Sequence, residues 1–203
     1  IQLQINRNPS LKTLRTNMKI VASNLGAWKK ATRETTDLSK PAGVFNVIVE
    51  AIQHKPQRRM KVFELLDETS HKHLEAGGLT IKRLQRALEK RFLRNANRQS
   101  FLKKHGLLWI ERVRGAKALF AGLWDNGFFK DELPLVNEVT IRAVQTLEGG
   151  RAVLTAATGK GERSFPFIQV EAGQWRFLGL GKVIRREAIT KPEAALEKLA
   201  EGP

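Results

Sequence analysis

The residues that could do acid–base or metal chemistry are sparse in this 203-residue chain. Asp67, His71 and His73 form a cluster of titratable groups near a predicted helix end, where the mouth of a pocket would lie. The two histidines are two positions apart, so on a helix their side chains diverge, whereas a zinc site needs convergent N, S or O ligands. The chain has no tyrosine and no cysteine. The sequence therefore predicts no catalytic residue, no metal site and no cofactor.

A run of basic residues gives a stronger functional signal. Between Lys82 and Lys117 there are twelve Lys or Arg and two acids, Glu89 and Glu111. Nine of these bases are predicted to bind an anionic partner: Lys82, Arg83, Arg86, Lys90, Arg91, Arg94, Arg98, Lys103 and Lys104. Positive charge gathered in a patch is enough to neutralise phosphates. The pattern indicates nucleic acid, an acidic protein or an anionic lipid surface as the partner.

Two aromatic residues interleave with these charges. Phe92 and Phe101 lie in the basic stretch between Arg91 and Lys104. Aromatic rings beside cations are typical of surfaces that stack the bases of single-stranded nucleic acids. Phe92 also continues an apolar stripe of its predicted helix, so a place in the core is the alternative for both rings.

A second basic stretch opens the chain. Residues 1–33 contain seven Lys or Arg and no acid. Apolar residues spaced three and four apart form a stripe typical of one helix face: Leu11, Leu14, Met18, Val21, Leu25 and Trp28. We interpret this part of the chain as a basic amphipathic helix. It is expected to pack on the core, to pair with a second copy or a partner, or to lie on an anionic lipid surface.

Between these basic stretches, glycine and proline delimit further predicted helices. One spans about residues 41–54 and ends before Pro56. The next ends at Gly77–Gly78, and a third begins at Thr80. Residues 107–124 are one helix or a strand followed by a helix, because periodicity does not settle short apolar runs.

Residues 137–180 alternate between apolar and polar side chains, as in strands with one buried face. Four runs are separated by glycine turns at residues 148–150, 159–161 and 172–174. In the first run, side chains separated by a multiple of two residues are expected on one face of the strand: Val139, Ile141, Ala143 and Leu147. Such short connections predict a meander of antiparallel strands.

Aromatic pairs mark the predicted buried face of the later strands. Phe165 and Phe167 share one face of the third run, and Trp175 and Phe177 share one face of the fourth. Pro166 has no amide hydrogen, which predicts an edge position or a bulge. Because such a sheet needs an apolar partner layer, we expect the preceding helices to cover one face.

This order of helices and then a meander resembles the NTF2-like superfamily over residues 39–181. Four stretches carry the similarity: Ser39–Pro41 with Val44–Ile52, Val62–Asp67, Glu148–Val153 and Ala172–Phe177. The resemblance implies an α+β fold in which a curved four-stranded antiparallel meander wraps around helices as a cone. Such domains often have an apolar pocket and often form dimers through the sheet. The family implies no single activity, because its members include enzymes, transport factors and secretion-system parts.

The sequence divides into three predicted segments. Residues 1–36 form the basic helical extension, residues 37–185 the NTF2-like α+β domain, and residues 186–203 a short C-terminal helix and tail. Thr190 and Glu193 fit a capping box at the start of that last helix.

Composition narrows the classes of function. Lys and Arg total 36 against 20 Asp and Glu, a formal net charge of +16, which favours anionic partners. The absence of cysteine excludes disulfides. No apolar run reaches the length of about 18 residues that a transmembrane helix needs. The first residue is Ile1 rather than Met, and together with the family analogy this suggests a processed protein of the periplasm or cell envelope.

Three functions follow as expectations. The first is a non-enzymatic NTF2-like binding or assembly domain of a bacterial cell-envelope protein that engages an anionic partner or surface. The second is a nucleic-acid-binding or ribonucleoprotein component that uses the basic helix at residues 82–104. The third is a small-molecule isomerase, dehydratase or carrier that uses the pocket of the cone.

Overall fold

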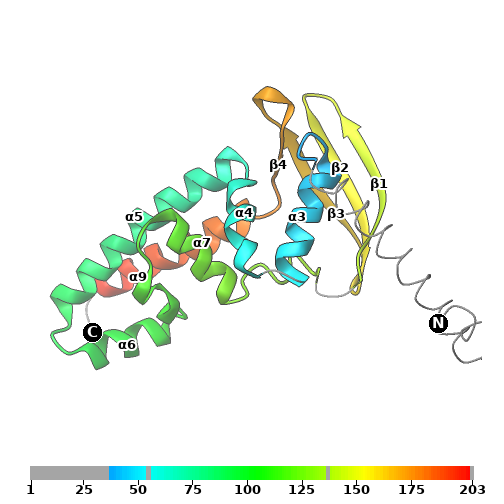
Figure 1. Cartoon of the computed structure of the whole chain (residues 1–203). Coiled ribbons are helices and arrows are strands. Elements are labelled where there is room, and N and C mark those ends of the chain that lie inside the picture. Colours follow the sequence, from blue (N-terminus) through cyan, green and yellow to red (C-terminus); the bar gives the residue numbers. More distant parts are fainter. Residues whose placement is uncertain (1–36, 54–55, 136–137, 202–203) are drawn as a thin grey trace, which may run out of the picture.

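The computed structural model describes residues 37–53, 56–135 and 138–201. The predicted extension at residues 1–36, with its stripe from Leu11 to Trp28, lies outside the described residues. Helices combine with a four-stranded antiparallel sheet, so the predicted α+β class is confirmed. Figure 1 shows the sheet at one end of the molecule and helices extending away from it.

The sheet is an open meander. Its strands are β1 (Thr140–Leu147), β2 (Arg151–Thr158), β3 (Gly161–Gln169) and β4 (Trp175–Phe177), paired as antiparallel neighbours in chain order. Gly149 and Gly150 adopt φ of 69° and 66°, which allows the tight turn after β1. The sheet is neither strongly curled nor closed (Figure 1), so the cone that the family resemblance implied is not seen. Most of the helices lie beyond the end of the sheet and not inside a concave face.

A bulge in β1 changes which of its side chains face the helices. The pairing register shifts between Ile141 and Ala143, and Arg142 is the extra residue. A shift of one residue turns the following side chains to the other face. By the pairing register, Ile141 and Val144 share the inner face, whereas Ala143 and Leu147 lie on the outer one. The prediction that these two share a face with Ile141 is therefore wrong, because strict alternation does not reveal a bulge.

The inner face of the sheet packs on α3 (Pro41–Gln53), as the sequence predicted. Phe165, Phe167, Trp175 and Phe177 are buried on this face. The ring of Phe45 in α3 lies 4.8 Å from that of Phe165, measured between centroids. These contacts supply the apolar partner layer that an isolated meander lacks.

Pro166 explains why β4 is short. Its carbonyl accepts a hydrogen bond of 3.0 Å from the amide of Leu178, just past the end of β4. Proline has no amide hydrogen to donate in return, so the β3–β4 ladder ends after three residue pairs. The predicted edge position or bulge is wrong, because β3 lies between β2 and β4 and pairs with β2 without a register shift.

A short segment between two helices ties the helices to the sheet. Leu65 accepts a 2.8 Å hydrogen bond from the amide of Phe177, and the amide of Asp67 donates to the carbonyl of Phe177 at 3.2 Å. This segment follows α4 (Arg59–Glu64) and leads into α5 (Glu68–Arg91), which has 24 residues. The position of α5 is therefore fixed at its start by β4.

The predicted helix end at Gly77–Gly78 is wrong, because α5 runs through both glycines. Thr80 is likewise buried inside α5 and starts no helix. Gly77 is buried, and a Cβ at this position would lie 2.6 Å from the Cβ of Ala188. Here glycine serves a close approach of two helices and not a turn.

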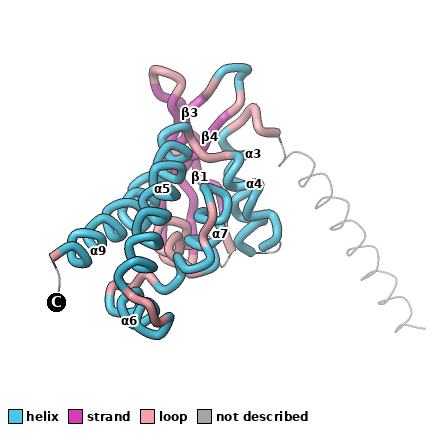
Figure 2. Tube along the Cα trace, turned by 90° about the vertical axis from the view of Figure 1, so that its left-hand side faces the viewer, coloured by secondary structure: helices cyan, strands magenta, loops and turns pink. Residues whose placement is uncertain are grey.

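The remaining helices follow α5 in the chain, and all but the first of them pack against it. They are α6 (Asn95–Lys104), α7 (Gly115–Asp125), α8 (Gly181–Arg185) and α9 (Lys191–Ala200). The ambiguous stretch at residues 107–124 contains a 3-10 helix (Leu108–Arg112) and most of α7, and no strand. Figure 2 shows α9 running beside α5, with α6 at the far end of the helices.

The C-terminal helices form one continuous run. A π-helical turn (Arg186–Thr190) joins α8 to α9. Thr190 has helical angles and makes no side-chain capping bond, so the predicted capping box is wrong. Thr190 lies inside a continuous helical run. Only the first amides of a helix lack a backbone partner, so a cap is not needed at this position.

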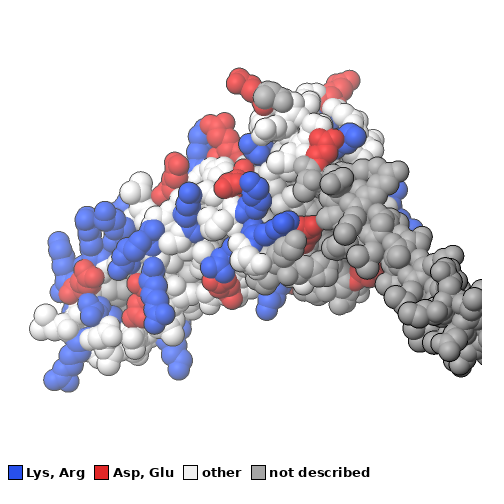
Figure 3. All heavy atoms as spheres, in the orientation of Figure 1, with Lys and Arg blue, Asp and Glu red and all other residues white. Residues whose placement is uncertain are grey.

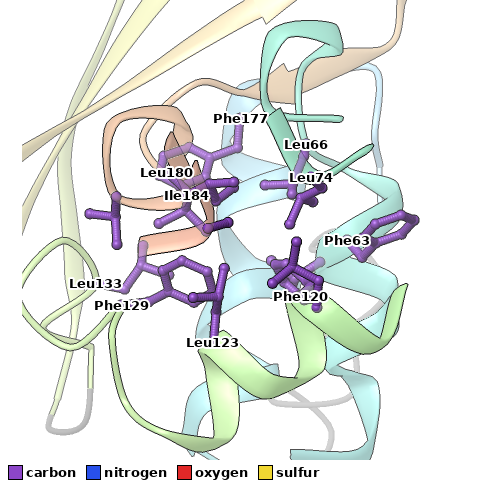
Figure 4. Close-up of a cluster of buried hydrophobic side chains, with 14 of the residues drawn as sticks. Phe63, Leu66, Leu74, Phe120, Leu123, Phe129, Leu133, Phe177, Leu180 and Ile184 are labelled. Carbon is purple, nitrogen blue, oxygen red and sulfur yellow. The ribbon is translucent and has the colours of Figure 1, made fainter. Parts of the chain in front are cut away.

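Helices and sheet share one core (Figure 4). Side chains from α4, α5, α7, α8, β4 and the segments between them meet in it: Phe63, Leu66, Leu74, Phe120, Leu123, Phe129, Leu133, Phe177, Leu180 and Ile184. This core is apolar and holds the first half of α5, leaving its second half to extend away from the sheet.

Candidate functional site

The second half of α5 separates an apolar face from a basic one. Its buried side chains are Ile81, Leu84 and Leu88. Four predicted binding residues are exposed on the other side: Lys82, Arg83, Arg86 and Lys90. Three of these bases recur every four residues, which aligns them along one stripe of the helix. The helix therefore presents a row of cations to solvent.

The other five predicted residues continue this surface past the end of α5. Arg91 is the last residue of α5, and Arg94 precedes the first turn of α6. Arg98 is half-buried in α6, and Lys103 and Lys104 form its last turn. We call the surface made by all nine predicted residues the basic surface. Figure 3 shows Lys and Arg gathered over this end of the molecule.

Among the described residues, the positive charge is concentrated in this part of the chain. Residues 82–117 hold twelve bases and two acids, whereas residues 138–201 hold ten bases and eight acids. The sheet and the C-terminal helices are therefore nearly neutral. An asymmetry of this kind directs an anionic partner to one end of the molecule.

The bases of this segment are not paired with the chain's own described acids. Nine described Lys or Arg form ion pairs within 4.0 Å: Lys40, Arg58, Arg59, Lys61, Lys72, Lys160, Arg186, Lys191 and Lys198. None of the twelve between Lys82 and Lys117 pairs with an acid in the described ranges. Like charges four residues apart destabilise a helix. The basic surface thus holds a repulsion that no ion pair with a described acid offsets.

An aromatic cavity opens beside the basic surface. It has a volume of about 720 Å³ and lies between the end of α5, α6 and α9. Phe92 and Phe101 line it with ring centroids 5.9 Å apart, and the ring of His105 lies 4.4 Å from that of Phe101. Arg91 and Lys104 line the same cavity. Both phenylalanines are half-buried, so they pack on the core and also line the cavity.

The wall that α9 contributes to this cavity is apolar and acidic, whereas α5 and α6 contribute basic residues. Ala194 and Leu199 are its apolar residues, and Glu197 and Glu201 are its acids. Lys198 donates to Glu201 at 2.8 Å, and this hydrogen bond and charge raise the pKa of the Lys198 ammonium. With two carboxylates and one ammonium, the α9 wall carries a formal net charge of −1.

A second hollow, of about 590 Å³, lies between α5 and the start of α7. Lys82 and Arg86 line it together with Arg114, and Glu75 and Glu89 are also part of the lining. Arg114 belongs to the basic run but was not among the nine predicted residues. Its neighbours at this site come from the folding of α7 against α5, which sequence spacing does not show. His105 was also missed, although it lies only four residues after Phe101, at the C-cap of α6.

Asp67, His71 and His73 each have a structural contact. Asp67 caps α5 and accepts a 3.2 Å hydrogen bond from the amide of Ser70. The ring of His71 packs at right angles against a core phenylalanine, 4.7 Å away. The Nδ1 of His73 lies 3.2 Å from the carbonyl oxygen of Gly181. Within the described residues no group of three His, Asp or Glu is placed to hold a metal ion.

Comparisons with known proteins give no match to a family model, to a curated protein or to a solved structure. The resemblance to the NTF2-like superfamily therefore stays a sequence-based prediction. The fold and the surface define an α+β protein whose helical end combines unpaired cations with an aromatic cavity. In the part of the chain that the structure describes, no helix has the length and apolarity to cross a membrane.

Proposed function

We propose that this chain is a nucleic-acid-binding protein that holds the phosphate backbone on its basic surface. The observation that carries the proposal is an excess of unpaired positive charge. The segment between Lys82 and Lys117 contains twelve bases and only two acids, and none of these bases forms an ion pair with a described acid. This function is the second of the three that are expected from the sequence, the one that uses the basic helix at residues 82–104.

The arrangement of the cations suits a chain of phosphates. Lys82, Arg86 and Lys90 rise along α5 by about 6 Å per step, at 1.5 Å per residue. A polymer with regularly spaced negative charges can meet them in sequence, and each contact releases condensed counterions. Binding also relieves the repulsion between these neighbours. An isolated small anion would neutralise only one or two of them.

The aromatic cavity favours nucleic acid over the other anionic partners. Phe92, Phe101 and His105 place ring surfaces next to the cations. Rings and cations together bind the two parts of a nucleotide, the base and the phosphate. An acidic protein or a lipid headgroup offers the charge without the flat base.

The proposal is tested by reversing charge in two places. Arg86, Arg91 and Arg94 change to Glu in one variant, and Arg142, Arg151 and Arg163, which lie exposed on the sheet, change to Glu in a control. Both variants alter the net charge equally. Fluorescence anisotropy with a labelled strand of about 20 nucleotides should show an affinity at least about tenfold lower for the first variant and a small change for the control.

Equal losses in the two variants would contradict the basic surface as the binding site. Vesicles of phosphatidylserine and phosphatidylcholine provide the competing outcome. Leu93, between α5 and α6, is 95% exposed and is the apolar residue that a membrane-bound arm would insert. Leu93→Asn should leave the affinity for the strand unchanged. Tight vesicle binding that depends on Leu93, without binding of the strand, would overturn the proposal.

A further inference from the structure

We infer that the aromatic cavity between α5, α6 and α9 accepts an unstacked base of a single-stranded nucleic acid. This inference rests on the proposed function and adds to it the class of nucleic acid and the place of the base. It concerns a site separate from the row of cations along α5.

The size and the lining of the cavity fit a base. Its volume of about 720 Å³ lies within the range of pockets that hold small ligands. The ring of Phe101 contacts two other rings, with centroid distances of 5.9 Å to Phe92 and 4.4 Å to His105. All three rings are half-buried, and the core holds Phe92 and Phe101 while part of each ring surface stays accessible. Fixed rings lose little conformational freedom when a base stacks on them.

The charges around the cavity favour a base inside it and phosphates outside it. Arg91 and Lys104 line the cavity from α5 and α6, where the basic surface begins. Glu197 and Glu201 line it from α9, and their carboxylates disfavour a phosphate at that wall. The neutral base is therefore expected inside, with its phosphates outside on the cations.

Glu197 supplies a further contact for the base. Glu201 is paired with Lys198, whereas Glu197 forms no ion pair with a described base. A carboxylate accepts hydrogen bonds and donates none. It therefore suits the amino and imino groups on the Watson–Crick edge of a base, which are accessible in a single strand. In a duplex this edge is paired and the base is stacked, so the cavity discriminates against duplexes.

The test compares two strands that have the same phosphates. One is a normal oligonucleotide of about 12 residues, and the other carries abasic sites at every position. For the wild-type chain the abasic strand should bind about tenfold more weakly, because the stacked base is lost. In Phe101→Leu, which keeps an apolar side chain but removes the ring, this difference should shrink to less than about threefold.

Phe128→Leu is the matched control. Phe128 is a half-buried phenylalanine that packs 5.4 Å from Trp109 and is not part of the cavity lining. This variant should keep the full difference between the two strands. Circular dichroism monitors folding of both variants. If Phe101→Leu unfolds, Phe92→Leu takes its place, and the comparison of strands on the wild-type chain stands without any variant.

The outcomes separate this inference from the proposed function. Equal affinity of the wild-type chain for the two strands would overturn the base site while leaving phosphate binding intact. Failure to bind either strand would contradict the proposed function and the inference together. A difference between strands that persists unchanged in Phe101→Leu and Phe92→Leu would place the base elsewhere and overturn the assignment of the cavity.

Discussion

Gly77 of α5 faces Ala188 of the π-helical turn with no space for a side chain between them. A Cβ on Gly77 would lie 2.6 Å from the Cβ of Ala188 and 3.1 Å from Cδ2 of Leu119. This approach brings the C-terminal helical run against α5. The same run continues into α9, which forms one wall of the aromatic cavity. A glycine in the middle of a long helix thus helps to build the candidate site.

Substitution of Gly77 should therefore destabilise the fold. Gly77→Ala forces the two helices apart and should lower the free energy of unfolding by about 1–3 kcal/mol. Gly78→Ala is the control, because the nearest atom to a Cβ there is 3.7 Å away. Alanine favours a helix over glycine by about 1 kcal/mol, so this variant should be as stable as wild type or more so. Urea denaturation measures both, and equal losses would contradict the close approach.

The buried carboxylate of Glu187 should depend on its two cations. Arg186 donates to it at 2.8 Å and Lys191 at 2.7 Å, and the Glu187 residue is 1% exposed. Changing both cations to Met leaves a buried charge without partners and should lower the free energy of unfolding by about 3–5 kcal/mol. Adding Glu187→Gln should recover most of this loss in urea denaturation. A triple variant as unstable as the double variant would show that the buried charge is not the cause.

Asp67 should act as a helix cap and not as an acid or base of a reaction. Its carboxylate accepts the amide of Ser70 at the start of α5. Asp67→Ala should lower the free energy of unfolding by about 1–2 kcal/mol, and Asp67→Ser, which also caps helices, should lose less. Thermal unfolding followed by circular dichroism ranks the three proteins. If serine and alanine destabilise equally, the capping role is wrong.

We expect Arg86 to lower the free energy of unfolding, although it contributes to the proposed binding of nucleic acid. Lys82 and Lys90 lie four residues to either side of it, and Glu89 offsets part of the resulting repulsion. Arg86→Gln removes two unfavourable pairs and should raise the free energy of unfolding by a few tenths of a kcal/mol in low salt. The gain should vanish in high salt, where exposed charges are screened. A salt-independent gain, or a loss in low salt, would contradict the repulsion.

Patterns of local sequence predicted much of the fold. The meander was predicted because its glycine turns and its aromatic pairs, such as Phe165 with Phe167, depend on neighbours in the chain. The bulge at Arg142 was missed, since an inserted residue leaves no mark on composition. Gly77 was misread as a helix end for a related reason. Its role depends on Ala188, more than a hundred residues away.

The candidate site was predicted in part. Nine bases in one run could be recognised because helix spacing alone aligns Lys82, Arg86 and Lys90. The aromatic cavity could not be assembled in the same way. Its α9 wall, with Glu197, joins Phe101 only through tertiary packing. Local periodicity contains no information about that contact.

The affinity of the unmodified chain for a single strand, measured as salt is varied, tests directly whether the basic surface binds phosphates. Between about 50 and 200 mM salt, the affinity should fall by about a hundredfold or more, because the basic surface neutralises several phosphates. In the variant with Arg86, Arg91 and Arg94 changed to Glu, the slope of log affinity against log salt should be shallower by about 2. An affinity that does not change with salt, or an equal slope in the two proteins, would contradict the account.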